Sequence, residues 1–345
     1  MKQIKELEIL IGSKIPRIEM SQFDNIIPFT CYVVKNKEVV LLSLSYCDLI
    51  DIPPLENMHS IKELYLYGNH ISDISGIASM NALEVLKLAE NDIKNIEPLQ
   101  KLHGLKKLSI WNNQVVDIRP LSGLVDLEYL SIGDNNVDDI SPLRDLCCLK
   151  GLSAGGNQIA DIAPFECLKD LTELFLERNI IADISILSSL IKLKKLWFGF
   201  NHVRDISALK SLKDLMDFSA GNNMIEDIGP ISFLDKLEEL MLQANDICDI
   251  TALSKLHKLR FLCLCQNRIS NMSPISCLSN LKMINLEGNQ IKQIPALGDL
   301  KMMQVLDVRN NLIDKSNIDN NTTKLEIKIN EEPFWCEDEG SGIYI

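Results

Sequence analysis

The 345-residue sequence lacks any run of about 18 consecutive apolar residues, the length that a helix needs to cross a bilayer. Its first twenty residues, MKQIKELEILIGSKIPRIEM, interrupt every apolar stretch with Lys or Glu. They therefore lack the uncharged segment of an export signal and fit a short amphipathic helix better. These absences predict a cytoplasmic protein that does not interact with membranes.

Basic residues are also scarce, with 35 Lys and Arg against 48 Asp and Glu and a net charge of −13. Such a surface repels phosphate backbones, so we expect no nucleic-acid partner. The ten cysteines fall at irregular spacings and lack the paired framework of a small secreted scaffold. This spacing predicts reduced thiols.

Catalytic motifs are missing as well. No H-E-x-x-H, G-x-S-x-G, P-loop or dinucleotide-binding glycine pattern occurs, and the five histidines are dispersed along the chain. Cys263 and Cys265 flank Leu264 on an expected strand, but no histidine stands at the neighbouring positions to complete a zinc site. We therefore expect no enzyme activity, no cofactor and no metal.

A periodic asparagine is the dominant feature that is present. It recurs at a constant step of 22 residues, and one further step backward reaches Cys47, which gives thirteen repeats over residues 39–315. The asparagines are Asn69, Asn91, Asn113, Asn135, Asn157, Asn179, Asn201, Asn223, Asn245, Asn267, Asn289 and Asn311.

Each repeat follows the frame L-x-x-L-x-L-x-x-N-x-I-x-D-I-x-x-L-x-x-L, as in residues 171–190. Alternation around Leu174 and Leu176 predicts a short strand with two inward leucines. A proline recurs at one frame position, at 98, 120, 142, 164, 230 and 274, and favours a tight 3₁₀ return segment. Stacked repeats of this kind bury leucine columns that no single repeat could bury alone.

Two polar columns accompany the leucines. The asparagine amide is placed to satisfy backbone groups where the chain leaves the strand. An aspartate follows four residues later in most repeats, at Asp73, Asp117, Asp139, Asp161, Asp183, Asp205, Asp227 and Asp249. These carboxylates resemble repeated metal ligands, but we interpret each one as an acceptor for N–H groups of the following turn.

The runs NQIADIAPF, NNVDDISPL and NQVVDIRPL resemble the 22-residue repeats of the internalin family, and similar repeats occur in the leucine-rich regulatory subunit of type-one protein phosphatases. The resemblance covers roughly residues 39–315. It implies an α/β leucine-rich-repeat solenoid, a curved right-handed superhelix with a parallel concave sheet and short 3₁₀ or irregular convex segments. It leaves a surface adhesin and a phosphatase regulator open as alternatives.

Open ends of such a stack expose leucines and need caps. We expect residues 1–38 to form an N-terminal helix and a β-hairpin that turns at Lys35, Asn36 and Lys37. Residues 316–345 are expected to form a C-terminal cap and tail, with a strand in 324–330 and with Phe334 and Trp335 over the last leucines.

The outward strand positions predict a binding face for a protein partner, so the chain is interpreted as an interaction scaffold or regulatory subunit. Rigid aromatics beside glycine and serine make anchors of the kind that dominate interfaces, although each ring could instead merely pack on its neighbours. The excess of outward carboxylates favours a partner with a basic or mixed surface, bound by a monomer. The candidate residues are Tyr65, Tyr67, Trp111, Tyr129, Phe175, Glu177, Trp197, Phe200, Asp217, Met241 and Phe261.

Overall fold

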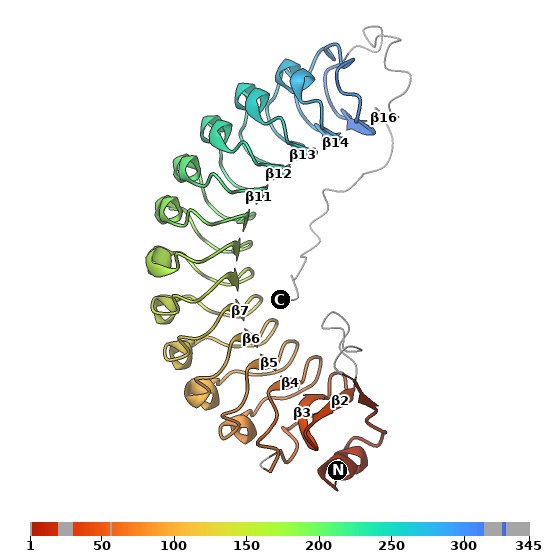
Figure 1. The fold of residues 1–345 in the computed structure, drawn as a ribbon. Helices are drawn as coiled ribbons and strands as arrows, with labels where there is room; N and C mark the ends of the chain where they lie inside the picture. Colours follow the sequence, from red (N-terminus) through yellow and green to blue (C-terminus); the bar gives the residue numbers. More distant parts are fainter. Residues whose placement is uncertain (1, 20–29, 56, 314–325, 329–345) are drawn as a thin grey trace. The chain divides into compact units, whose positions relative to one another are not determined.

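The computed structural model describes residues 2–19, 30–55 and 57–313, and the backbone of 326–328 (Figure 1). The chain divides into two compact units, a first unit that reaches Asp170 and a second unit that begins at Leu171. Among the described residues, no helix is long and apolar enough to cross a membrane. The expected Phe334–Trp335 cap lies outside the described residues.

The first unit begins with α1 (Lys2–Leu10), which buries Ile4 and Leu7. A short strand, β1 (Arg17–Ile18), pairs in parallel with β2 (Cys31–Lys35), and β2 forms an antiparallel hairpin with β3 (Glu38–Ser43). This helix and hairpin lie where the sequence predicts them. The repeat strands that follow in parallel are β4 (Glu63–Tyr65), β5 (Val85–Lys87), β6 (Lys107–Ser109), β7 (Tyr129–Ser131) and β8 (Gly151–Ser153).

The second unit continues the same pattern. Each strand pairs in parallel with the next, and each residue lies opposite the residue 22 positions later as far as β14. The strands are β9 (Glu173–Phe175), β10 (Lys195–Trp197), β11 (Asp217–Ser219), β12 (Glu239–Met241), β13 (Phe261–Cys263), β14 (Met283–Asn285), β15 (Val305–Asp307) and β16 (Glu326–Lys328). Strand β16 lies within the segment where a final strand is expected, and its backbone pairs with β15.

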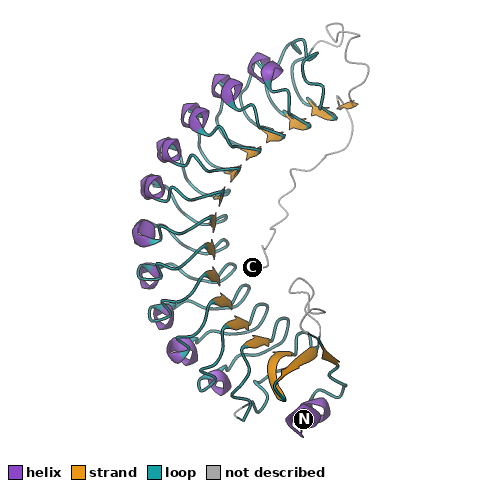
Figure 2. Cartoon of the chain, viewed as in Figure 1, coloured by secondary structure: helices purple, strands orange, loops and turns teal. Residues whose placement is uncertain are grey.

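Short 3₁₀ helices return the chain in most repeats, and Figure 2 shows them on the side of each unit opposite its strands. Many carry proline in their first turn, which confirms the 3₁₀ assignment from the proline column. They are η2 (Ser75–Ile77), η3 (Glu97–Lys101), η4 (Arg119–Leu121), η5 (Ser141–Leu143), η6 (Ala163–Cys167), η7 (Ser185–Ser189), η8 (Ser207–Ser211), η9 (Gly229–Phe233), η10 (Thr251–Lys255) and η11 (Ser273–Cys277).

The core lies between the strands and the 3₁₀ helices, and the asparagine ladder closes one side of it. Asn201 is typical: its Nδ2 donates to the carbonyls of Leu176 and Phe198 at 3.0 and 2.9 Å, and its Oδ1 accepts the N–H of Ile181 at 2.9 Å. One amide thus satisfies buried backbone groups of two successive repeats, as the sequence predicts. At the variant position, the backbone N–H of Cys47 donates to Asn69 Oδ1 at 3.0 Å.

The aspartate column has the structural role that we expected. Asp183 Oδ1 accepts the N–H of Ser185 at 2.8 Å, and every predicted aspartate makes the equivalent bond. The bond fixes the entry into each 3₁₀ helix. Where asparagine replaces aspartate, at Asn95 and Asn271, the amide oxygen accepts in the same way.

One backbone position per repeat adopts positive φ. It recurs every 22 residues from Tyr46 to Asn310, and glycine occupies only three of these sites, at 68, 156 and 288. Bulky residues such as Phe200, with a φ of 55°, are forced into this conformation. The tight exit from each strand therefore overrides local preference.

Candidate protein-binding face

We define the strand face of each unit as the residues at the first and third positions of its repeat strands and the residues two and three positions after each strand. In the second unit the third positions run Phe175, Trp197, Ser219 and Met241 across four adjacent strands. Phe261 occupies the first position of β13 and lies beside Glu239. The structure therefore places the predicted aromatic residues of this unit on one common face.

Trp197 is the centre of this face. Its ring is half-exposed and meets Phe175 edge-on, with ring centroids 5.1 Å apart and an interplanar angle of 73°. Its indole Nε1–H donates to Asp217 Oδ1 at 2.9 Å. These two contacts hold the indole in one orientation while part of its surface stays accessible.

Glycines follow the strands beside this tryptophan. A Cβ on Gly199 would lie 3.1 Å from the carbonyl oxygen of Gly221, because the two backbones approach each other closely. A Cβ on Gly221 would meet the side chain of Gln243, whose Oε1 is buried without a hydrogen-bond partner. Because these glycines have no side chains, the surface beside the indole is formed by backbone.

Positive groups only weakly compensate the charge of the Asp217 carboxylate. Burial raises its pKa to about 6, the hydrogen bond from Trp197 opposes that rise, and the charge of Glu239 adds to it. Lys195 occupies the neighbouring first position, but its ammonium pairs with Glu173, with Nζ 3.3 Å from Oε1. Asp217 therefore presents a negative charge that its neighbours only partly neutralise.

The remaining candidates of the second unit surround this centre. Met241 and Phe261 are half-buried, and the guanidinium of Arg260 lies 5.5 Å from the Phe261 ring centroid. Phe200 follows β10 and has positive φ, and the guanidinium of Arg178 lies 5.4 Å from its ring centroid. Glu177 follows β9 and is half-buried.

The predicted residues of the first unit form a different surface. Tyr65 donates its hydroxyl to Glu63 at 2.9 Å, and Tyr67 donates to Glu90 at 2.6 Å. Trp111 donates its Nε1–H to Asp134 at 2.7 Å, and its ring lies against Gly133. The ammonium of Lys107 lies 5.2 Å from the centroid of the Tyr129 ring.

Burial corrects the sequence prediction at several of these positions. We expected exposed rings at Tyr65, Tyr67 and Phe175, but only 5%, 7% and 3% of their surfaces are accessible. For these rings the alternative of packing against neighbours describes the structure, and Tyr67 meets Tyr46 edge-on at 5.2 Å. Trp111 and Trp197 retain accessible surface.

A further difference concerns charge. Arg309 and Asp307, which occupy outward positions of the repeat frame, form a buried ion pair with Nη2 2.6 Å from Oδ2. Eight cysteines in the described ranges carry free thiols. Sequence periodicity placed these side chains on the strand face but gave no information on their partners.

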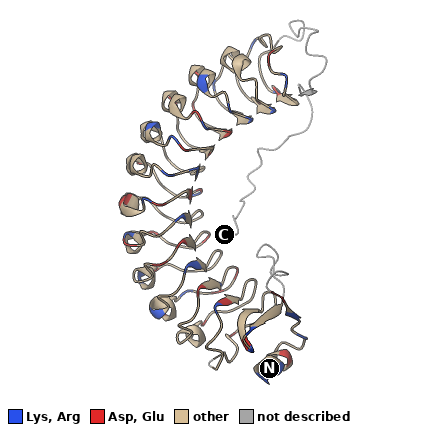
Figure 3. Ribbon diagram, viewed as in Figure 1, with Lys and Arg blue, Asp and Glu red and all other residues tan. Residues whose placement is uncertain are grey.

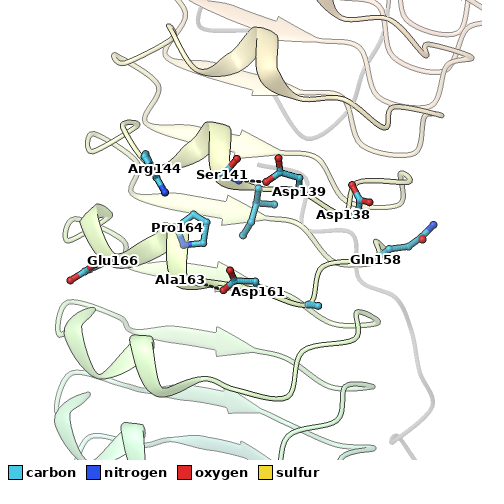
Figure 4. A pocket seen from close by; sticks show the side chains of 11 residues that line it. Asp138, Asp139, Ser141, Arg144, Gln158, Asp161, Ala163, Pro164 and Glu166 are labelled. Atoms are coloured by element: carbon cyan, nitrogen blue, oxygen red, sulfur yellow. Dashed lines mark hydrogen bonds between the residues drawn. The ribbon is translucent and has the colours of Figure 1, made fainter.

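The acidic and basic positions are interspersed along both units (Figure 3). A hollow of about 470 Å³ opens between two repeats of the first unit and includes Asp138, Asp139, Arg144 and Asp161 (Figure 4). Asp139 and Asp161 already accept turn N–H groups there. Nowhere in the described ranges do three or more His, Cys, Asp or Glu side chains converge as a metal site would need.

This geometry, a short parallel strand, an asparagine ladder and a 3₁₀ return every 22 residues, defines a leucine-rich-repeat protein. A family model for leucine-rich repeats matches residues 37–79, 103–145, 149–189 and 257–301. A comparison with curated protein sequences found no match.

Solved structures agree with this class. The chain is similar to an internalin from Listeria monocytogenes, with 30% identity, a TM-score of 0.82 and coverage of 85% of this chain and 87% of that one. A leucine-rich-repeat protein of Leptospira interrogans shares 23% identity, with a TM-score of 0.73 and 82% of each chain covered. The plant peptide hormone receptor RGFR1 in complex with RGF2 shares the fold at 18% identity and a TM-score of 0.59, over 79% of this chain and 56% of that one. The chain belongs to the leucine-rich-repeat family, with repeats of the internalin type.

Proposed function

We propose that this chain is a non-enzymatic scaffold or regulatory subunit that binds a protein partner on the strand face of its second unit. The observation that carries the proposal is the Trp197 centre. A half-exposed indole, held by Phe175 and Asp217 and bordered by glycines, is the type of rigid anchor around which interface energy concentrates. The core gains little from a tryptophan at this position.

The charge of the same face indicates the partner's surface. At their first and third positions, strands β9–β15 carry one ammonium group and four carboxylates, of which Asp307 is buried with Arg309. A partner with a basic or mixed surface would neutralise this excess and be attracted to the face before contact. We place this binding in the cytoplasm, with the chain acting as a monomer.

The test uses the full chain as bait in three forms: wild type, Trp197→Ala and the control Ile191→Ala, whose side chain is 60% exposed away from the strand face. We expect wild type and the control to retain one common protein that Trp197→Ala loses, with unchanged melting curves. Equal retention by all three baits would refute the proposed site. A phosphatase assay on the eluate then distinguishes a phosphatase regulator from other scaffolds.

A surface adhesin is the second candidate, and the similarity to an internalin favours it. Fractionation of the source cells separates the two candidates. Recovery at the cell surface supports the adhesin, whereas recovery in the cytoplasm supports the scaffold.

A further inference from the structure

A half-buried lysine stands on the strand face of the first unit. Lys87 occupies the third position of β5, between Tyr65 on β4 and Ser109 on β6. In the part of the chain that the structure describes, no hydrogen bond or ion pair engages its ammonium group. A partly desolvated charge without a partner costs free energy in the unbound protein.

Other lysines of this unit show that the fold readily supplies partners. Lys62 and Lys106 both pair with Glu84, one repeat away on either side, and Lys150 pairs with Glu128 at 2.6 Å. These pairs form because opposite charges occupy equivalent positions in adjacent repeats. At Lys87 the equivalent positions hold a tyrosine and a serine.

The neighbouring charges do not compensate for this. Lys107, at the first position of β6, adds a second positive charge, and together with burial it lowers the pKa of Lys87 to about 8. On β4 the carboxylate of Glu63 accepts the Tyr65 hydroxyl, and after β5 Glu90 accepts the Tyr67 hydroxyl. Neither of these carboxylates forms an ion pair with Lys87.

The surface next to Lys87 is suited to anionic oxygens. The third positions of β6, β7 and β8 are Ser109, Ser131 and Ser153, so small hydroxyl side chains continue the row that Lys87 begins. Lys107 is exposed, and its ammonium lies over the Tyr129 ring without an acidic partner. Ser109 lies beside Lys87 in the sheet, and Lys107 is near enough for its charge to act on Lys87.

We propose that Lys87, Lys107 and Ser109 form a subsite for an anionic group of a bound protein, either a carboxylate or a phosphoryl or sulfuryl group. Both sources share the charged oxygens that ammonium and hydroxyl donors recognise. The subsite lies wholly in the first unit. It does not depend on the Trp197 centre and can be tested without the partner.

The test is an NMR titration of the full chain labelled at its lysine side chains, in sodium chloride, sodium acetate and sodium sulfate at matched ionic strength. We expect Lys87 to titrate near pH 8 in chloride and at a higher pH in at least one of the other salts, with a saturable dependence on the anion. A stronger response to acetate assigns a carboxylate, and a stronger response to sulfate assigns a phosphoryl or sulfuryl group. Identical titration of Lys87 in all three salts would overturn the proposal.

Two controls separate a specific subsite from general screening. Lys101, on η3, should show no anion-specific change, and a shift equal to that of Lys87 would contradict the subsite. Lys107→Gln should weaken the anion response of Lys87 by about tenfold while the Lys87 signal still reports a folded protein. An undiminished response in this variant would exclude Lys107 from the subsite.

Discussion

The two units differ in charge at the first and third positions of their repeat strands. Strands β4–β8 carry one carboxylate and two ammonium groups there, whereas β9–β15 carry one ammonium group and four carboxylates, of which Asp307 is buried with Arg309. Both units keep the buried leucines, the asparagine ladder and the turn-capping aspartates. The backbone is therefore fixed by inward residues, and the outward positions are free to vary in chemistry from one stretch to the next.

The two tryptophans sharpen this contrast. Trp111 and Trp197 each donate an indole N–H to an aspartate, at 2.7 and 2.9 Å. Trp111 lies against Gly133, whereas Trp197 stands edge-on to Phe175 and borders the half-buried carboxylate of Asp217. The same pair of residue types thus has different neighbours in the two units.

The largest effect should be the same in both units. Asn113→Ala and Asn201→Ala each remove an amide that bonds buried backbone groups of two repeats, so each should lower the free energy of unfolding by about 1–3 kcal/mol. Chemical denaturation measures the change. Asn136→Ala, which alters an exposed side chain, is the matched control and should leave the midpoint unchanged. A large difference between the first two variants would mean that the ladder does not support both units equally.

The second prediction separates the units by binding. Trp197→Ala should weaken binding of the recovered partner by about 2 kcal/mol, because a rigid and partly exposed ring is lost from the contact. Trp111→Ala should have a smaller effect, since Trp111 lies in the first unit and the proposed contact is centred on the second. Calorimetric titration measures both affinities. A greater loss from Trp111→Ala would move the main contact to the first unit.

The third prediction concerns pH, and the two units should respond in opposite directions. The pKa of Asp217 is raised to about 6, so the folded chain binds this proton more tightly than the unfolded chain does, and stability increases as pH falls from about 6 to about 4. The pKa of Lys87 is lowered to about 8, so the folded chain releases its proton more readily, and stability increases as pH rises from about 8 to about 10. Both charges therefore destabilise the fold most at neutral pH.

Substitution tests each half of this statement. Asp217→Asn keeps an acceptor for the Trp197 N–H and should raise the free energy of unfolding at pH 7 by about 1–2 kcal/mol. This advantage over wild type should disappear by about pH 4, where the wild-type carboxylate is protonated. Lys87→Met should give a similar gain at pH 7 that disappears by pH 10. Denaturation at several pH values measures the gains. A variant less stable than wild type at pH 7 would show that its charge is already compensated.

The smallest effect should come from the surface ion pairs. Lys150 pairs with Glu128 in the first unit and Lys236 with Asp214 in the second, each at 2.6 Å and largely exposed. Lys150→Ala and Lys236→Ala should leave the denaturation midpoint within experimental error, because solvent screens such pairs. A clear loss from either variant would show that charge along the edges differs between the units.

Much of the fold could be predicted from the sequence because its information is periodic. The 22-residue step fixes which leucines face inward, where Asn201 must bond and why Asp183 precedes a turn. Exposure was less predictable. Phe175 and Tyr65 occupy outward positions, yet side-chain contacts across the sheet decide how much of each ring remains accessible. The isolation of Lys87 likewise depends on which residues stand one repeat away and how far their side chains reach.

The ladder bonds always join residues separated by fixed intervals, 20 residues for the accepted N–H and 25 for the most distant carbonyl. Excising one complete 22-residue segment within a unit would restore each of these intervals across the junction, whereas deleting a single residue would shorten every interval that spans the junction and move those donors away from their acceptors. The repeats are in this sense interchangeable, because all of them have the same length. Its reach could be shortened or extended by about 4.8 Å per segment without redesigning the interior.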